Sequence, residues 1–241
     1  MEAADDGAVQ RAVPYAEHAD HHDRRVLDVY RPKDGGHDLP VVLLWHGSGP
    51  NERDALAGLA RAVASQGCLC LVPDWQSDDV IRGRRDLLES LSFTLSRSER
   101  WGGHGGRIAL AGWSLGANAA ADVVLHPGVV DGWRPRALVG IAGSYDGSPI
   151  TDFPLAEGRA SDTGVRCVLI HGIQDSVVPV QRSRDTHQAL QEWGWSSVLR
   201  EVDTDHAGVI GARYDPTSSR CIPERTPQFV GPVAAWISAC F

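Results

Sequence analysis

Short apolar runs of strand character alternate with amphipathic segments of helical period along most of this 241-residue chain. The pattern predicts strands at residues 25–30, 41–45, 68–72, 107–111, 137–142, 166–170 and 197–202. It predicts helices at residues 54–66, 80–95, 115–125, 182–193 and 228–239. Such alternation with short links is typical of a mostly parallel sheet with helices on both faces. We therefore expect an α/β fold whose ligand site lies at the C-terminal edge of the strands.

The chain is expected to form one domain, because α/β sheets commonly reach this length as a single unit. No internal repeat, charge block or linker divides it, so the domain is expected to span residues 25–241. The first 24 residues are polar and include His18, His21 and His22. A cluster of His and Asp can bind a metal, but a solvated terminal segment is the more ordinary interpretation. Residues 1–24 are therefore expected to form a flexible N-terminal arm.

Charge and hydropathy exclude several classes of function. The 23 Lys and Arg residues against 31 Asp and Glu give a net charge of −8, which repels phosphate backbones. We therefore expect no nucleic-acid partner. The longest apolar runs are too short to cross a bilayer, and the chain opens on an acidic stretch rather than a basic one. These features predict a soluble, cytoplasmic protein with no membrane contact, present as a monomer or a small homo-oligomer.

The five cysteines are Cys68, Cys70, Cys167, Cys221 and Cys240, and their spacing is not that of a zinc site. The sequence therefore predicts no bound metal. Free thiols are expected in a reducing compartment, and an odd count agrees with this. The alternative is a disulfide between Cys221 and Cys240, which flank the last predicted helix.

The motif that carries chemistry is Gly112-Trp113-Ser114-Leu115-Gly116. It lies between a predicted strand and a predicted helix, and a direct strand-to-helix turn needs small residues on both sides of its apex. Gly112 and Gly116 provide this space and leave Ser114 at the tip with an exposed hydroxyl. Ser114 is therefore the candidate nucleophile.

A serine nucleophile needs a base, and the base needs a carboxylate that fixes its orientation. His206 follows the strand at residues 197–202 and lies at the same sheet edge as Ser114. Asp175 follows the strand at residues 166–170, one helix and one strand before His206. The predicted triad is therefore Ser114, Asp175 and His206, in the chain order of one particular hydrolase fold.

Acyl transfer also requires donors for the oxyanion that forms on the substrate. The main-chain N–H of Leu115, directly after the nucleophile, is one candidate. The turn after the predicted strand at residues 41–45 reads His46-Gly47-Ser48-Gly49, and its glycines allow close approach of the backbone. Gly47 and Ser48 are therefore the other candidates, and His46 is expected to shape this loop.

With these motifs the chain resembles the α/β-hydrolase superfamily from about Val26 to Trp236. The likeness is strongest to small serine carboxylesterases of the hormone-sensitive-lipase-like and feruloyl-esterase-like branch. It rests on residues 27–32 and 41–49, the Ser114 motif, Ser144-Tyr145-Asp146, His171-Gly172 with Asp175 and Pro179, and His206. This branch often carries His-Gly-Gly-Gly, and here Ser48 replaces one glycine while keeping its main-chain N–H. Some members place the triad acid one strand earlier, which makes Asp146 the competing acid.

The resemblance implies an enzyme without metal or cofactor that cleaves carboxylic esters through an acyl-enzyme. Relatives often insert a cap in the region of residues 143–165, but this segment is too short for a sizeable cap domain. We therefore expect an open cleft, flanked by Trp45, Trp75 and Trp113, and a preference for short-chain or small soluble esters. The alternatives are a peptidase or thioesterase with the same triad, or a non-catalytic protein of this fold that only binds ligands.

Overall fold

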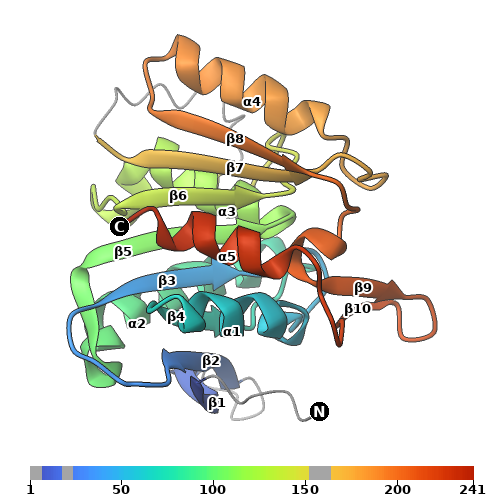
Figure 1. Cartoon of the computed structure of the whole chain (residues 1–241). Helices are drawn as coiled ribbons and strands as arrows, with labels where there is room; N and C mark the ends of the chain where they lie inside the picture. The colour runs from blue at the N-terminus through green and yellow to red at the C-terminus, as the bar shows by residue number, and fades with distance from the viewer. Residues whose placement is uncertain (1–6, 18–23, 152–163) are drawn as a thin grey trace.

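The apolar runs of the sequence form the centre of an eight-stranded sheet in the computed structural model, which describes residues 7–17, 24–151 and 164–241 (Figure 1). The strands of this sheet are β1 (Gly7–Glu17), β2 (Arg24–Pro32), β3 (Leu39–Trp45), β4 (Leu69–Pro73), β5 (Gly103–Trp113), β6 (Ala137–Ile141), β7 (Arg166–Gly172) and β8 (Ser197–Val202). The helices are α1 (Ala57–Ser65), α2 (Val80–Arg97), α3 (Leu115–Leu125), α4 (Gln181–Glu192) and α5 (Val230–Ser238).

The strand order is β1-β2-β4-β3-β5-β6-β7-β8, and every pair from β4 to β8 is parallel. Strands β1 and β2 run antiparallel to their neighbours at one edge. The parallel strands therefore end together at one side of the molecule, as seen for β3, β5, β6 and β7 in Figure 1. This arrangement brings the loops after β3, β5, β7 and β8 to a common edge.

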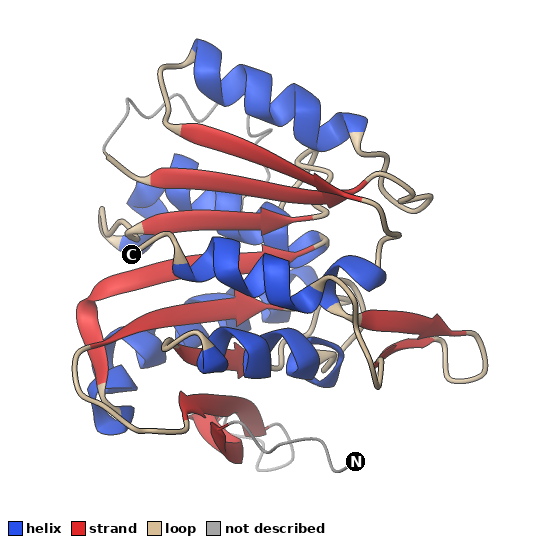
Figure 2. Cartoon of the chain, viewed as in Figure 1, coloured by secondary structure: helices blue, strands red, loops and turns tan. Residues whose placement is uncertain are grey.

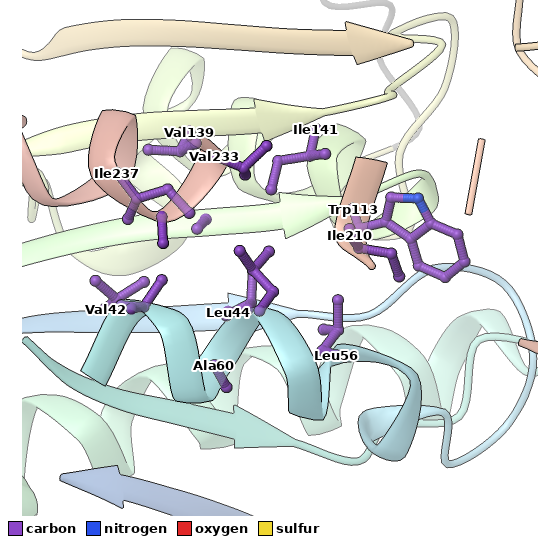
Figure 3. Packing of buried hydrophobic residues seen from close by; sticks show 14 of the residues in the cluster. Val42, Leu44, Leu56, Ala60, Trp113, Val139, Ile141, Ile210, Val233 and Ile237 are labelled. Atoms are coloured by element: carbon purple, nitrogen blue, oxygen red, sulfur yellow. The ribbon is translucent and has the colours of Figure 1, made fainter. Parts of the chain in front are cut away.

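Alternating residues of β3 explain why its sequence is apolar throughout. Val42 and Leu44 belong to a buried cluster with side chains of α1 and α5, whereas Val41 and Leu43 pack with side chains of α2 and α3. A strand covered on both faces reads as a continuous apolar run. Figure 2 shows the helices on the two sides of the sheet, and Figure 3 shows the first cluster. The predicted α/β architecture is confirmed.

The N-terminal segment differs from its prediction. Within the predicted arm of residues 1–24, Gly7–Glu17 forms edge strand β1, paired antiparallel with β2. A buried carboxylate stabilises the pairing: Asp28 accepts hydrogen bonds from the Ala12 amide (2.9 Å) and from Arg11, and it forms an ion pair with Arg53 (3.2 Å). The alternation of this strand is interrupted by register shifts, which hide it in the sequence. His18, His21 and His22 lie outside the described residues.

A second unpredicted element is the hairpin of β9 (Ala212–Asp215) and β10 (Arg220–Pro223). In the chain it lies between β8 and α5, and in space it projects beyond the sheet (Figure 1). Arg220 anchors it to the loop after β3 through an ion pair with Glu52 (3.0 Å) and a hydrogen bond to the carbonyl of Asn51 (2.6 Å). The hairpin is therefore held beside the sheet edge where ligands bind in this class of fold.

The connection from β6 to β7 is the segment in which the sequence predicts no sizeable cap domain. Its described residues, 142–151 and 164–165, contain no helix or strand, and residues 152–163 lie outside the description. Cys221 and Cys240 are both free thiols, so the alternative of a disulfide between them is not realised. In the described part of the chain, no helix has the length and hydropathy needed to span a membrane.

Candidate active site

Ser114 occupies a strained turn between β5 and α3. Its φ of 54° and ψ of −121° lie in a region that side-chain-bearing residues rarely adopt. The flanking glycines are required here, because a Cβ on Gly112 would lie 2.1 Å from the Gly116 carbonyl oxygen. A Cβ on Gly116 would in turn lie 2.4 Å from the carbonyl oxygen of His46. The local sequence thus forces Ser114 to the apex of the turn.

The loop after β3 lies directly against this apex. A Cβ on Gly47 would lie 2.9 Å from the Cβ of Ser114, so only glycine fits at this position. Ser48 and Ser114 both line one cavity of about 440 Å³, and Leu115 begins α3. The amide of Leu115, at the helix start, has no partner within the helix. The structure therefore places the predicted oxyanion residues Gly47, Ser48 and Leu115 next to Ser114.

The buried side chain of His46 fixes the orientation of this loop. Its Nε2 accepts hydrogen bonds from the amides of Glu52 and Trp75, both at 3.2 Å, so the ring hydrogen resides on Nδ1. Nδ1 donates to the carbonyl oxygen of Gly47 at 2.8 Å. Because the carbonyl and the following N–H of a trans peptide point in opposite directions, the Ser48 amide faces away from His46. Burial lowers the pKa of His46 to about 3, which keeps the ring neutral.

The predicted acid and base are joined by a hydrogen bond. Nδ1 of His206 lies 2.6 Å from Oδ2 of Asp175. A main-chain hydrogen bond joins the two loops that carry them: the backbone N–H of Gln174 donates to the carbonyl oxygen of Thr204 at 3.0 Å. Gly172 permits this contact, since a Cβ there would lie 2.3 Å from the Thr204 oxygen. These contacts place His206 and Asp175 at the same edge as Ser114.

Asp175 is held as a carboxylate by several donors. Burial raises its pKa, but hydrogen bonds from His171, His206 and the Val178 amide outweigh burial and hold the pKa well below its usual range. Its Oδ1 accepts from the amides of Val177 (2.9 Å) and Val178 (2.8 Å). Oδ2 is left to face the two histidines. A carboxylate in this position stabilises the protonated form of the histidine it contacts.

Trp113, the residue before Ser114, bonds to His206. Its Nε1 donates to the carbonyl oxygen of His206 at 2.9 Å, and the two rings lie 5.1 Å apart. His206 and Ser114 line the same cavity, so base and hydroxyl face a common space. Within the described residues the Ser114 hydroxyl has no hydrogen-bond partner of its own. In unliganded sites the bond between nucleophile and base is often long and tightens when substrate binds.

Some predicted side chains lie elsewhere. Asp146 pairs with Arg182 at 3.5 Å and accepts a hydrogen bond from Ser144, whereas His206 contacts Asp175. Trp45 and Trp75 are fully buried and do not line the cavity, in contrast to Trp113. Hydrogen bonds hold both indoles inside the protein: Trp45 donates to the Ser90 hydroxyl of α2 at 3.0 Å, and Trp75 donates to the His46 carbonyl at 3.2 Å.

The cavity also contains residues that the motifs did not indicate. These are Ser176, Val177, Asp205, Ala207, Tyr214 and Cys221. Tyr214 and Cys221 come from the unpredicted hairpin, so no local signal marked them. Burial, together with the nearby carboxylates of Glu52 and Asp205, raises the pKa of Cys221 to about 11. The thiol is therefore neutral near pH 7 and does not compete as a nucleophile.

Among the described residues, no group of three or more His, Cys, Asp or Glu side chains could hold a metal ion.

Comparison with known proteins places the chain by its fold. No protein-family model matches the sequence, and no curated protein matches it. Among solved structures, a truncated carbohydrate esterase from gut microbiota superimposes with a TM-score of 0.74 at 16% identity, over 99% of this chain and 98% of that one. Esterase B from Lactobacillus rhamnosis, inhibited by a tributyrin phosphonate, gives 0.78 at 14% identity, over 98% and 85%. Thermogutta terrifontis esterase 2, phosphoramylated by tabun, gives 0.73 at 14% identity, over 99% and 94%.

This chain has the α/β-hydrolase fold. The superpositions cover 98–99% of this chain, so the likeness in fold extends over the whole sheet. Ser114, Asp175 and His206 follow β5, β7 and β8 of this α/β-hydrolase frame. The predicted fold class is therefore confirmed.

Proposed function

We propose that this protein is a serine hydrolase that cleaves carboxylic esters through an acyl-enzyme, with Ser114, His206 and Asp175 as its triad. The observation that carries the proposal is that the strained Ser114 and His206 line one cavity, and that Nδ1 of His206 is hydrogen-bonded to the buried carboxylate of Asp175. Three esterases share the fold, two of them in complex with phosphorus inhibitors, which supports the same reaction class.

The chemistry follows from the positions of these groups. Ser114 Oγ attacks the ester carbonyl while Nε2 of His206 accepts its proton, and Asp175 stabilises the resulting imidazolium. The negative charge on the former carbonyl oxygen is bound by the amides of Leu115 and of Gly47 or Ser48. His206 then protonates the leaving alcohol, and water repeats the sequence on the acyl-enzyme to release the acid.

The substrate class is that of small esters with short acyl chains. The site cavity of about 440 Å³ holds a small organic molecule, and its walls include Val177, Ala207 and Tyr214. The connection between β6 and β7 is too short to add a helical lid that would cover a long acyl chain. We expect turnover of p-nitrophenyl esters to be highest at acetate or butyrate and to fall towards palmitate.

The decisive test is the variant Ser114→Ala, assayed on p-nitrophenyl acetate and with a fluorophosphonate probe that labels reactive serines. We expect at least a thousandfold loss of turnover and complete loss of labelling, with an unchanged circular dichroism spectrum. Ser176→Ala is the matched control, because Ser176 lines the same cavity and has no assigned role. Full activity of the Ser114 variant would remove the assignment.

A further inference from the structure

His171 lies at the end of β7 and is completely buried, four residues before the proposed triad acid. Its Nε2 lies 3.2 Å from Oδ2 of Asp175 and 2.9 Å from the carbonyl oxygen of Val178. Its Nδ1 lies 2.7 Å from the Ser183 hydroxyl of α4. Both ring nitrogens therefore have partners inside the protein.

These partners determine where the ring hydrogen resides. Nε2 faces two oxygens that can only accept, so it carries the hydrogen. Nδ1 then accepts from the Ser183 hydroxyl, which satisfies a neutral ring without exposing it to water. His171 thus donates to the same carboxylate oxygen that faces His206 at 2.6 Å.

We propose that His171 is a positioning residue that holds Oδ2 of Asp175 toward His206 and limits the negative charge that this oxygen presents. The proposal rests on the proposed function, since it assigns a role within the same triad. A donor that shares Oδ2 weakens the attraction of this oxygen for the His206 imidazolium. Removing the donor should therefore favour protonated His206, which cannot act as the base.

The other titratable groups around the pair are bonded elsewhere, neutral or exposed. Glu201 of β8, opposite His171 in the sheet, binds Arg184 of α4 at 2.7 Å. Asp205, next to His206, accepts from the amides of Ala207 and Gly208 at 3.1 and 2.7 Å. Cys221 is neutral near pH 7 because its pKa is raised to about 11, mainly by burial. Burial also raises the pKa of Tyr145, which lies near β6. Tyr214 lines the cavity and is exposed.

The test compares kcat and the pH dependence of kcat/KM for wild type, His171→Leu and His171→Gln. The leucine variant removes the donor, whereas the glutamine amide places a donor near the position of Nε2. For His171→Leu we expect kcat to fall about tenfold, the equivalent of one hydrogen bond to a charged group. We also expect its acidic limb to move up by about half a pH unit. His171→Gln should recover most of both effects.

His187→Leu is the matched control, since Nδ1 of His187 also bonds a serine hydroxyl, that of Ser197 at 2.8 Å, and we expect no change for it. If His171→Leu does not fold, the glutamine variant and Ser183→Ala, which frees Nδ1, provide the comparison; Ser183→Ala should give a smaller shift in the same direction. A fall in kcat without a shift of the acidic limb would show a merely structural role and overturn the proposal. Wild-type values in every variant, or a shift to lower pH, would also overturn it. If the wild-type protein does not turn over the ester at all, the esterase function itself is refuted instead.

Discussion

His46 illustrates how one buried side chain can fix the shape of a loop, here the loop after β3. It accepts from two amides on one side and donates to the Gly47 carbonyl on the other. Its ring also stacks on Trp75 at 5.3 Å between centroids. The neutral ring is needed in this arrangement, because a proton on Nε2 would meet two N–H donors.

This requirement makes the free energy of unfolding depend on pH. The pKa of His46 is lowered from 6.5 to about 3 by burial, so below pH 6.5 the unfolded chain binds a proton that the native chain does not. Acid therefore destabilises the native state by up to about 1.4 kcal/mol per pH unit from this residue. Urea titrations between pH 7 and 4.5 should show this loss, and His46→Gln should be less stable at pH 7 but lose less on acidification. Equal slopes for the two proteins would contradict the assignment.

Several site residues could be predicted because their requirements are local. The small residues around Ser114 follow from the turn itself, and Gly47 follows from the glycine-rich loop after a buried strand. The partnership of His206 with Asp175 required only the order of strands in the sheet. Tyr214 could not be predicted, because its place in the cavity depends on a hairpin that is positioned by distant contacts of Arg220.

At the scale of elements, the β9–β10 hairpin supplies part of the cavity wall through Tyr214 and Cys221. Its Tyr214 keeps 59% of its surface exposed although it lines the cavity, and Val177 from the loop after β7 keeps 70%. Exposed apolar side chains grouped at a proposed site indicate contact with an apolar part of a ligand.

We expect Tyr214→Ala to raise KM for phenyl acetate about fivefold, the equivalent of about 1 kcal/mol of ring contact, and to change kcat little. The effect on ethyl acetate should be smaller, because this ester has no ring to pack on Tyr214. Ile81→Ala on α2 is a suitable control, since Ile81 is 84% exposed and does not line this cavity. Steady-state kinetics on both esters measure the difference, and equal effects on the two esters would refute a ring contact.

The predicted strands and helices of the α/β alternation are present with small changes at their ends. Their apolar periodicity follows from the buried clusters on the two faces of the sheet, to which most of these elements contribute side chains. The sequence does not predict β1, β9 and β10 for a physical reason: β1 contains register shifts, and β9 and β10 are short and partly exposed. Where the core does not impose a pattern, the sequence contains little periodic signal.

At the scale of the whole molecule, β1 closes one edge of the sheet and covers Asp28. A chain that begins at Arg24 would lose the Arg11 and Ala12 contacts of this buried carboxylate and expose β2 as an edge. We expect it to fold with a thermal midpoint lower by about 5–10 °C, which corresponds to a few kcal/mol at this size. It should also aggregate more readily, because an unpaired strand can pair with another chain.

Differential scanning calorimetry and light scattering test this expectation. Arg11→Ala in the full chain should show part of the loss of stability without the aggregation. An unchanged midpoint in the shortened chain would mean that β1 contributes nothing to the stability of the domain.

The backbone of Ser114 has a consequence for how such a chain can evolve. Glycine adopts positive φ at no steric cost, so replacing this serine should relieve strain and make the protein harder to melt. Selection for heat resistance alone would therefore favour sequences that have lost the hydroxyl at this position. Persistence of the serine in a lineage would then record a continuing demand for turnover, independent of any demand for durability.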